Sequence, residues 1–176
     1  FIESNQSTPD ETICLPELFE HNITTLQAGY FIVEVEIDGL LIESDDWVGA
    51  FNGDVCTGTK LWDTTQCGGG ICNIIIFGDD GGEYAEGYMT VGQIPTFIIY
   101  DVSENTYFEA NTIEPPAQWE NLNISVIDLL TNQIIGCTDQ FACNYNFNAI
   151  IEDGSCDYDD DNDGICNNDE ILGCTD

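Results

Sequence analysis

Short segments of apolar residues, separated by turn residues, follow one another through the first three quarters of the chain. In residues 30–37 the apolar side chains alternate with Glu34 and Glu36, which is the period of two that a half-buried strand requires. Asp38 and Gly39 come next and are typical of a hairpin turn. The side chains predicted to share the apolar face of this strand are Phe31, Val33, Val35 and Ile37.

Further strands are predicted at short spacing along the chain. Turns rich in Gly and Asp separate them, and no stretch shows a convincing helical period. The sequence therefore predicts an all-β fold, an antiparallel β-sandwich. The expected strands cover residues 47–51, 55–61, 71–77, 96–100, 107–110 and 122–130, and in the last of them Leu122, Ile124 and Val126 alternate.

The length of 176 residues allows one medium domain and a small module. Residues 1–25 are polar and turn-rich, and we expect them to form a lead-in segment with one edge strand at most. The β-sandwich is expected at residues 26–131. Beyond it the composition changes, and residues 132–176 are expected to form a cysteine-rich repeat module.

Acidic side chains outnumber basic ones by an extreme margin. The chain has 34 Asp and Glu residues against Lys60 and one histidine, His21, and its formal net charge is -33. Nucleic acid and anionic membranes are excluded as partners because phosphate binding needs the Lys and Arg that are absent. No apolar run reaches membrane-spanning length, so no membrane insertion is expected. Self-repulsion of this size favours bound divalent cations. The acidic surface of a halophile's protein is the alternative explanation, which the cysteine content makes less natural.

Nine cysteines in this chain indicate disulfides, and hence an oxidising compartment outside the cytoplasm. Zinc binding is the alternative, but zinc prefers C-x2-C pairs or Cys/His sets, and the cysteine spacings here differ. Three glycines between Cys67 and Cys72 permit a tight return of the chain, so these two cysteines are predicted to form a local disulfide. We therefore expect an extracellular or cell-surface location.

Residues 159–170 match the calcium-loop pattern D-x-D-x-D-G-x5-E at each position. Calcium takes six to eight oxygens, and alternate residues of a tight loop direct theirs at one centre. Gly164 permits the sharp turn that brings the Ile165 carbonyl inward. A solvated acidic linker is the alternative interpretation. The predicted ligands are Asp159, Asp161, Asp163, the Ile165 carbonyl, Asn167 and Glu170, with Asp157 as a weaker candidate.

A second cation site is a weaker hypothesis for Asp79 and Asp80 in the turn at residues 78–83. Asp45 or Asp46 would contribute if the two loops meet. A plain acidic turn explains Asp79 and Asp80 equally well.

The segments at 46–56 (DWVGAFNGDVC), 77–81 (FGDDG), 86–89 (EGYM) and 94–97 (IPTF) resemble a secreted β-domain that recurs in large multidomain surface proteins of Bacteroidetes-type bacteria. The resemblance implies a location and an architecture and no catalytic role. Its aromatic residues have two interpretations, a stacking platform for sugars or the protein core, of which we favour the core. These residues are Trp47, Trp62, Tyr84 and Tyr88.

The tetrapeptide GCTD occurs at residues 136–139 and again at 173–176, a period of 37 residues. The unit that it opens resembles the extracellular GCTD, ACNYN, DGSC repeat of arrays on bacterial surface proteins. The acidic loop that follows is similar to the calcium loops of type 3 thrombospondin repeats and dockerins, although no pair of helices is expected around it. We therefore expect a tandem array cut short, and a chain that is a piece of a larger protein. In such a module metal and disulfides replace a hydrophobic core.

The remaining cysteines are predicted to pair within and beside this module. The predicted pairs are Cys137 with Cys156, Cys143 with Cys166 and Cys14 with Cys56, which leaves Cys174 for a following repeat.

No constellation of catalytic residues stands out. A nucleophilic triad would need His21, which lies in a polar stretch without a matching partner motif, and no Arg is present to bind an anion. Pairs of carboxylates that could hydrolyse glycosides are too numerous here to be informative. We therefore expect no enzyme but a calcium-stabilised structural or adhesive segment of a secreted surface or fibre protein, packed against copies of itself or adjacent repeats. The alternative is a carbohydrate-binding β-sandwich with a calcium-binding tail and glycans as its ligands.

Overall fold

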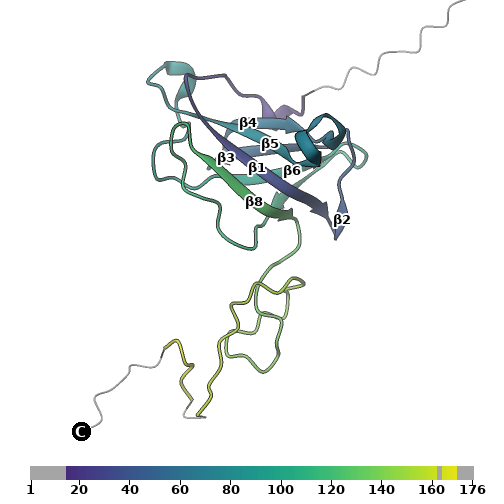
Figure 1. The fold of residues 1–176 in the computed structure, drawn as a ribbon, viewed down its shortest axis with the longest axis vertical. Helices are drawn as coiled ribbons and strands as arrows, with labels where there is room; N and C mark the ends of the chain where they lie inside the picture. The colour runs from purple at the N-terminus through teal and green to yellow at the C-terminus, as the bar shows by residue number, and fades with distance from the viewer. Residues whose placement is uncertain (1–14, 162–163, 170–176) are drawn as a thin grey trace, which may run out of the picture.

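The computed structural model describes residues 15–161 and 164–169. Within these residues the chain is mostly β, and its only helical segments are single 3₁₀ turns (Figure 1). The strands are β1 (Leu26–Ile37), β2 (Leu40–Leu41), β3 (Trp47–Asn52), β4 (Val55–Leu61), β5 (Cys72–Gly78), β6 (Thr96–Asp101), β7 (Thr106–Ala110) and β8 (Ile124–Thr131). The turns are η1 (Glu17–Phe19), η2 (Thr64–Gln66), η3 (Gly68–Gly70) and η4 (Glu83–Ala85).

The strands form two four-stranded sheets. Sheet A has the order β2-β1-β5 with β8 added to the other side of β1, and sheet B has the order β4-β3-β6-β7. The prediction of antiparallel pairing is confirmed for the other strand pairs and wrong for β1 and β8, which run parallel. The physical reason is the connection after β7, which returns the chain to the end of the sheet where β1 begins. There Leu122 N donates to Gln27 O over 2.7 Å.

One hydrophobic core fills the space between the two sheets. Sheet A contributes Tyr30, Ile32, Ile74 and Ile76 to it, and sheet B contributes Val48, Ala50, Phe97 and Ile99. Trp119, from the connection between β7 and β8, is buried in the same core and donates its Nε1–H to Ile76 O over 3.0 Å. The two sheets therefore pack in a sandwich-like arrangement that the β7–β8 connection helps to complete.

The face of β1 that is buried differs from the prediction. Tyr30 and Ile32 enter the core, Val33 is 38% exposed, and burial resumes at Val35. Two successive residues, Val33 and Glu34, are exposed at the point where pairing with β5 has ended. The alternation therefore changes phase within the strand. The sequence could not show this because residues 30–33 are all apolar, so either phase fits them.

The segment before β1 forms no strand between residues 15 and 25. The possible edge strand is therefore absent from the described part of the lead-in. Phe19 of η1 is instead buried against sheet B, with its ring 5.8 Å from that of Phe51 and 5.7 Å from that of Tyr107. This segment acts as a cover for the outer face of sheet B.

The described residues 132–161 and 164–169 hold turns, bends and one isolated parallel bridge, between Ile135 and Ile151. They extend away from the sheets beyond the end of β8 (Figure 1). Among the described residues, no helix is long and apolar enough to cross a membrane.

Candidate functional site

Three disulfides cross-link the part of the chain that the structure describes. They join Cys67 to Cys72, Cys137 to Cys156 and Cys143 to Cys166, with Cα–Cα distances of 5.0, 4.8 and 6.3 Å. These three predicted pairs are confirmed. The first closes the glycine turn η3 before β5, and the other two lie within residues 137–166. Three disulfides fit a secreted or extracellular protein.

The predicted bridge between Cys14 and Cys56 is wrong. Cys56 is a free cysteine, buried in a cluster with Phe19 and Phe51, and its thiol donates to Gly58 O over 3.6 Å. Burial raises the pKa of this thiol to about 11. The side chain therefore serves as a small apolar group beneath η1. Cys14 and Cys174 lie outside the described residues.

The acidic loop closes on itself between residues 158–160 and 164–167. Gly164 adopts a left-handed φ of 93°, which favours glycine, and its N–H donates to Asp159 Oδ2 over 2.9 Å. Asn167 accepts from Asp160 N at 3.2 Å and donates to Asp160 Oδ2 at 2.9 Å. The sharp turn expected at the sixth loop position is therefore present.

The loop is also tied to the repeat that precedes it. Asp157 accepts the N–H of Cys143 on its carbonyl over 2.7 Å, and its carboxylate accepts the N–H of Asn168 over 3.3 Å. The disulfide from Cys143 to Cys166 makes the same connection covalently. Asp157 thus joins the two ends of the loop, which is a structural role beside the weaker ligand role that the sequence suggested.

The residues described in the loop fit part of a calcium site. Asp159, Asp161, the Ile165 carbonyl and Asn167 offer the oxygen atoms that calcium prefers. The predicted ligands Asp163 and Glu170 lie outside the described residues. The glycine turn and the Asp159 contact are the observations on which the calcium hypothesis depends.

Asp79 and Asp80 have protein partners that explain them without a cation. Asp80 Oδ2 accepts from both the N–H and the hydroxyl of Thr25, each at 3.0 Å, and from the Tyr84 hydroxyl at 3.1 Å. The Thr25 N–H is the main cause that lowers the Asp80 pKa. Asp79 accepts from Gly81 N. The structure thus favours the acidic-turn interpretation.

Asp46 lies in a different environment and does not join this turn. It is buried, and its two carboxylate oxygens accept from Glu43 N at 2.7 Å and from Val102 N at 2.9 Å. Burial raises its pKa, and the backbone hydrogen bonds partly oppose that shift. Asp46 therefore fastens the loop before β3 to the turn after β6.

Among the described residues, one group of three possible metal ligands consists of Cys137, Glu152 and Cys156. Their ligand atoms all lie within 4.8 Å of one another. Both sulfurs belong to a disulfide, which removes the thiolates that metals bind. Glu152 Oε2 accepts from the N–H and the hydroxyl of Thr138, each at 2.7 Å, and these bonds lower its pKa. A metal ion would fit this group only in the reduced protein, and nothing about it favours calcium.

The four aromatic residues do not form one stacking platform. Trp62 and Tyr88 are buried and Trp47 is partly buried, as the core interpretation predicts. Tyr84 differs, since 52% of its surface is exposed. It lines an open cavity of about 600 Å³ between η4 and the lead-in segment, together with Leu15, Glu20, His21, Asn22, Val55, Glu86 and Tyr88. No sequence pattern predicted this cavity, because it depends on where the lead-in segment packs.

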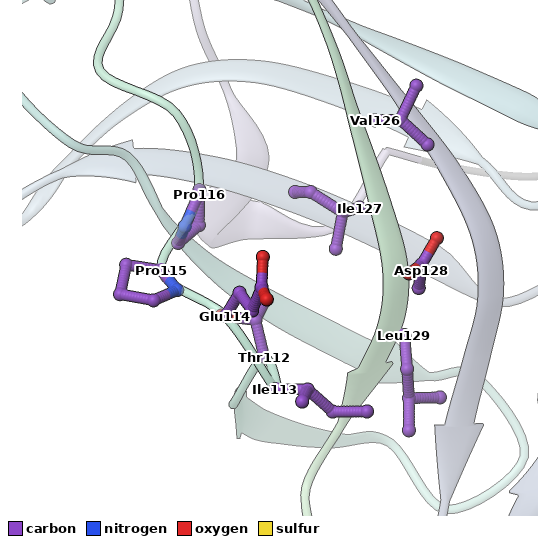
Figure 2. A pocket seen from close by; sticks show the side chains of 9 residues that line it. All are labelled: Thr112, Ile113, Glu114, Pro115, Pro116, Val126, Ile127, Asp128 and Leu129. Carbon is purple, nitrogen blue, oxygen red and sulfur yellow. The ribbon is translucent and has the colours of Figure 1, made fainter. Parts of the chain in front are cut away.

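A smaller cavity of about 150 Å³ separates residues 112–116 from β8. Figure 2 shows Pro115 and Pro116 on one side of it and β8 on the other. Proline has no N–H to donate to a neighbouring strand. Residues 112–116 thus lie along the outer edge of β8 without forming a further strand of sheet A.

The outer face of sheet A carries uncovered aliphatic side chains. Ile124 and Val126 are 68% and 66% exposed, and strand pairing places Val126 beside Phe31. Gly29, between Ile124 and Ile75 in the same register, leaves open space above the sheet. We call this surface the outer strip; it comprises Phe31, Val33, Ile75, Leu122, Ile124 and Val126.

Comparison with known proteins adds no relationship. No protein-family model, no curated protein and no solved structure matches this chain.

Proposed function

We propose that this chain is a structural or adhesive segment of a secreted cell-surface or extracellular fibre protein. In this proposal residues 26–131 form a β-sandwich, and residues 132–176 form a repeat module stiffened by disulfides and calcium. Neighbouring copies or adjacent repeats are the partners. The proposal assigns no catalytic activity to the chain.

The observation that carries the proposal is the outer strip. Its six side chains are uncharged although the formal net charge of the chain is -33, and the three on or next to β8 are each more than 60% exposed. Contiguous exposed apolar residues of this kind mark interaction surfaces. Fully burying one Val or Ile side chain contributes about 1.5–3 kcal/mol, so Ile124 and Val126 together would add about 3 kcal/mol to association.

The position of β8 supports the same proposal. It is the last strand on its side of sheet A, and residues 111–116 lie along its outer edge, so a partner would pack on the exposed face that carries Ile124 and Val126. Repulsion between acidic copies opposes such contacts, and bound divalent cations reduce that repulsion. Calcium in the acidic loop therefore has two roles in the proposal, ordering the tail and lowering its charge.

Sedimentation velocity of the chain, in calcium and after chelation, tests the proposal. We expect calcium to promote association, and we expect Ile124→Asp with Val126→Asp to abolish it. Ile23→Asp is the matched control, because Ile23 is 78% exposed and lies outside the outer strip. A chain that stays monomeric at all concentrations, or a double variant that associates like the control, would refute the proposal.

Calcium binding is tested separately by calorimetry on the same chain. Wild-type protein should bind calcium with a dissociation constant of about 1 mM or tighter, the range of extracellular modules. Asp159→Asn removes one charge of the loop while keeping an acceptor for Gly164 N, and it should weaken binding. Equal affinities in the two proteins would remove calcium from the proposal.

Carbohydrate binding is a second candidate function, and one observation favours it. Tyr84 presents a half-exposed aromatic ring to a cavity large enough for a small-molecule ligand.

A further inference from the structure

Tyr84 is exposed but fixed in place. Its hydroxyl donates to Asp80 Oδ2 over 3.1 Å, and Asp80 is in turn held by Thr25 and by the N–H of Gly82. A side chain at position 82 would come within 2.4 Å of the Tyr84 ring, so the ring packs directly on Gly82. Asn22 Nδ2 donates to the Tyr84 carbonyl over 3.2 Å. The ring is therefore oriented before any ligand arrives, which lowers the entropy lost on binding.

The imidazole ring of His21 lines the same cavity and is also fixed by protein contacts. The imidazole of His21 stacks on Phe77 with ring centroids 5.7 Å apart. Its Nδ1 lies 3.1 Å from the Phe19 carbonyl. Because a carbonyl only accepts, Nδ1 carries the hydrogen, and Nε2 is the ring nitrogen left for a ligand.

Other polar groups of the cavity indicate which hydrogen-bonding groups and which charge a ligand would carry. Glu20 and Glu86 line it with exposed carboxylates, which only accept hydrogen bonds when ionised. These two carboxylates favour a ligand rich in donors, and the charge of -33 disfavours an anionic ligand. A flat face that can lie on an aromatic ring, surrounded by hydroxyl donors, describes a neutral sugar.

We propose that the cavity between residues 20–22 and 84–88 binds a neutral saccharide. One sugar ring stacks on Tyr84, its hydroxyls donate to the carboxylates of Glu20 and Glu86, and one hydroxyl meets His21 Nε2. The inference rests on the second candidate function and gives it a site. The site is independent of the acidic loop and of the outer strip.

The first experiment screens the full chain against neutral oligosaccharides of hexoses, deoxyhexoses and N-acetylhexosamines. Calorimetry measures affinity, and NMR follows the imidazole of His21, the one histidine of the chain. We expect binding that shifts the His21 signals, persists after chelation of calcium and changes little between low and high salt.

Tyr84→Ala should weaken binding about tenfold, the upper range for loss of one aromatic contact. Tyr145→Ala is the matched control, since Tyr145 is 45% exposed and lies in the tail. Glu86→Gln removes a charge from the exposed rim and should also weaken binding. Urea unfolding of each variant confirms that the fold is retained.

Each other outcome overturns the inference in a distinguishable way. If a saccharide binds equally to the wild type and Tyr84→Ala, carbohydrate binding stands but this site is wrong. If no oligosaccharide binds, the site and the second candidate function both fail, while the association experiment still decides the first. If only Nα-acetyl-lysine methylamide binds, with an affinity that falls with salt, the cavity recognises organic cations instead.

Discussion

Gly58 of β4 lies against the backbone of β5 in the other sheet, so substituting it tests how the two sheets are joined. A Cβ atom added at Gly58 would lie 2.0 Å from the carbonyl oxygen of Ile75 in β5. Ordinary van der Waals contact begins at 3.4 Å, so the two strands would have to separate by about 1.4 Å. Gly58 and Ile75 both lie in paired strands, and no side chain can rotate away to relieve the contact.

Overpacking of this kind costs about 1–3 kcal/mol. We expect the upper end, about 3 kcal/mol, for Gly58→Ala because the contact is between two backbones. With a urea m-value of about 2 kcal/mol/M, this moves the unfolding midpoint down by about 1.5 M. Equilibrium unfolding followed by the fluorescence of the buried Trp62 and Trp119 measures the shift.

Gly29→Ala is the matched control for this experiment. Gly29 also lies in a strand, β1, but no atom lies within 4 Å of an added Cβ. Its free energy of unfolding should stay within about 0.5 kcal/mol of the wild type or increase slightly. If Gly58→Ala unfolds at the same urea concentration as Gly29→Ala, the close approach of β4 and β5 is refuted.

Three further predictions concern buried and titrating groups. Phe19→Ala should lower the free energy of unfolding by about 3–5 kcal/mol. The control Leu18→Ala shortens a side chain that is 53% exposed and should change the free energy of unfolding by less than about 0.5 kcal/mol. Equal effects of the two substitutions would contradict the packing of η1. NMR titration should place the Asp46 midpoint above the ordinary Asp value of 3.8 and the Asp80 midpoint below it. Asp46 then contributes stability below pH 3.8 that is lost as pH rises through its folded pKa. Asp80 contributes stability above pH 3.8 that is lost as pH falls through its folded pKa. Two midpoints on the same side of 3.8 would be evidence against one of the two environments. Iodoacetamide at pH 8 should leave Cys56 unlabelled in the native protein and label it in urea without reductant, because its thiol is buried and free. A Cys56 that is not labelled in urea would show that it is in a disulfide after all.

Local sequence patterns predicted the features that depend on neighbouring residues. The predicted strand at residues 55–61 coincides with β4, and the other strand boundaries differ by a few residues at most, apart from the start of β1. The disulfide between Cys67 and Cys72 followed from the glycines between them. In each case the turn residues and the alternation lie within the segment that they determine.

Features that depend on distant segments could not be predicted in this way. The parallel pairing of β8 depends on a connection that places Leu122 next to Gln27. The burial of Phe19 depends on how a polar segment folds over sheet B. The orientation of Ile124 and Val126 was open for the same reason, because an apolar alternation does not reveal which side of a sheet will be covered.

The candidate sites were predicted unevenly. The acidic loop carries its signal in consecutive residues, and the turn at Gly164 agrees with it. The cavity at Tyr84 combines residues 15–22 with residues 84–88, which are more than sixty positions apart. Only the folded chain brings His21 and Tyr84 to one surface.

The parallel pairing of β1 and β8 determines how the fold would respond to mechanical force. β1 begins and β8 ends at opposite ends of the same ladder, which joins seven residue pairs from Gly29 with Ile124 to Glu36 with Thr131. Tension applied through the chain before Leu26 and after Thr131 would pull the two strands past each other. In this shear geometry the ladder hydrogen bonds bear the load together instead of breaking one at a time. We therefore expect the β1–β8 ladder to bear the load under tension and to determine the rate of forced unfolding.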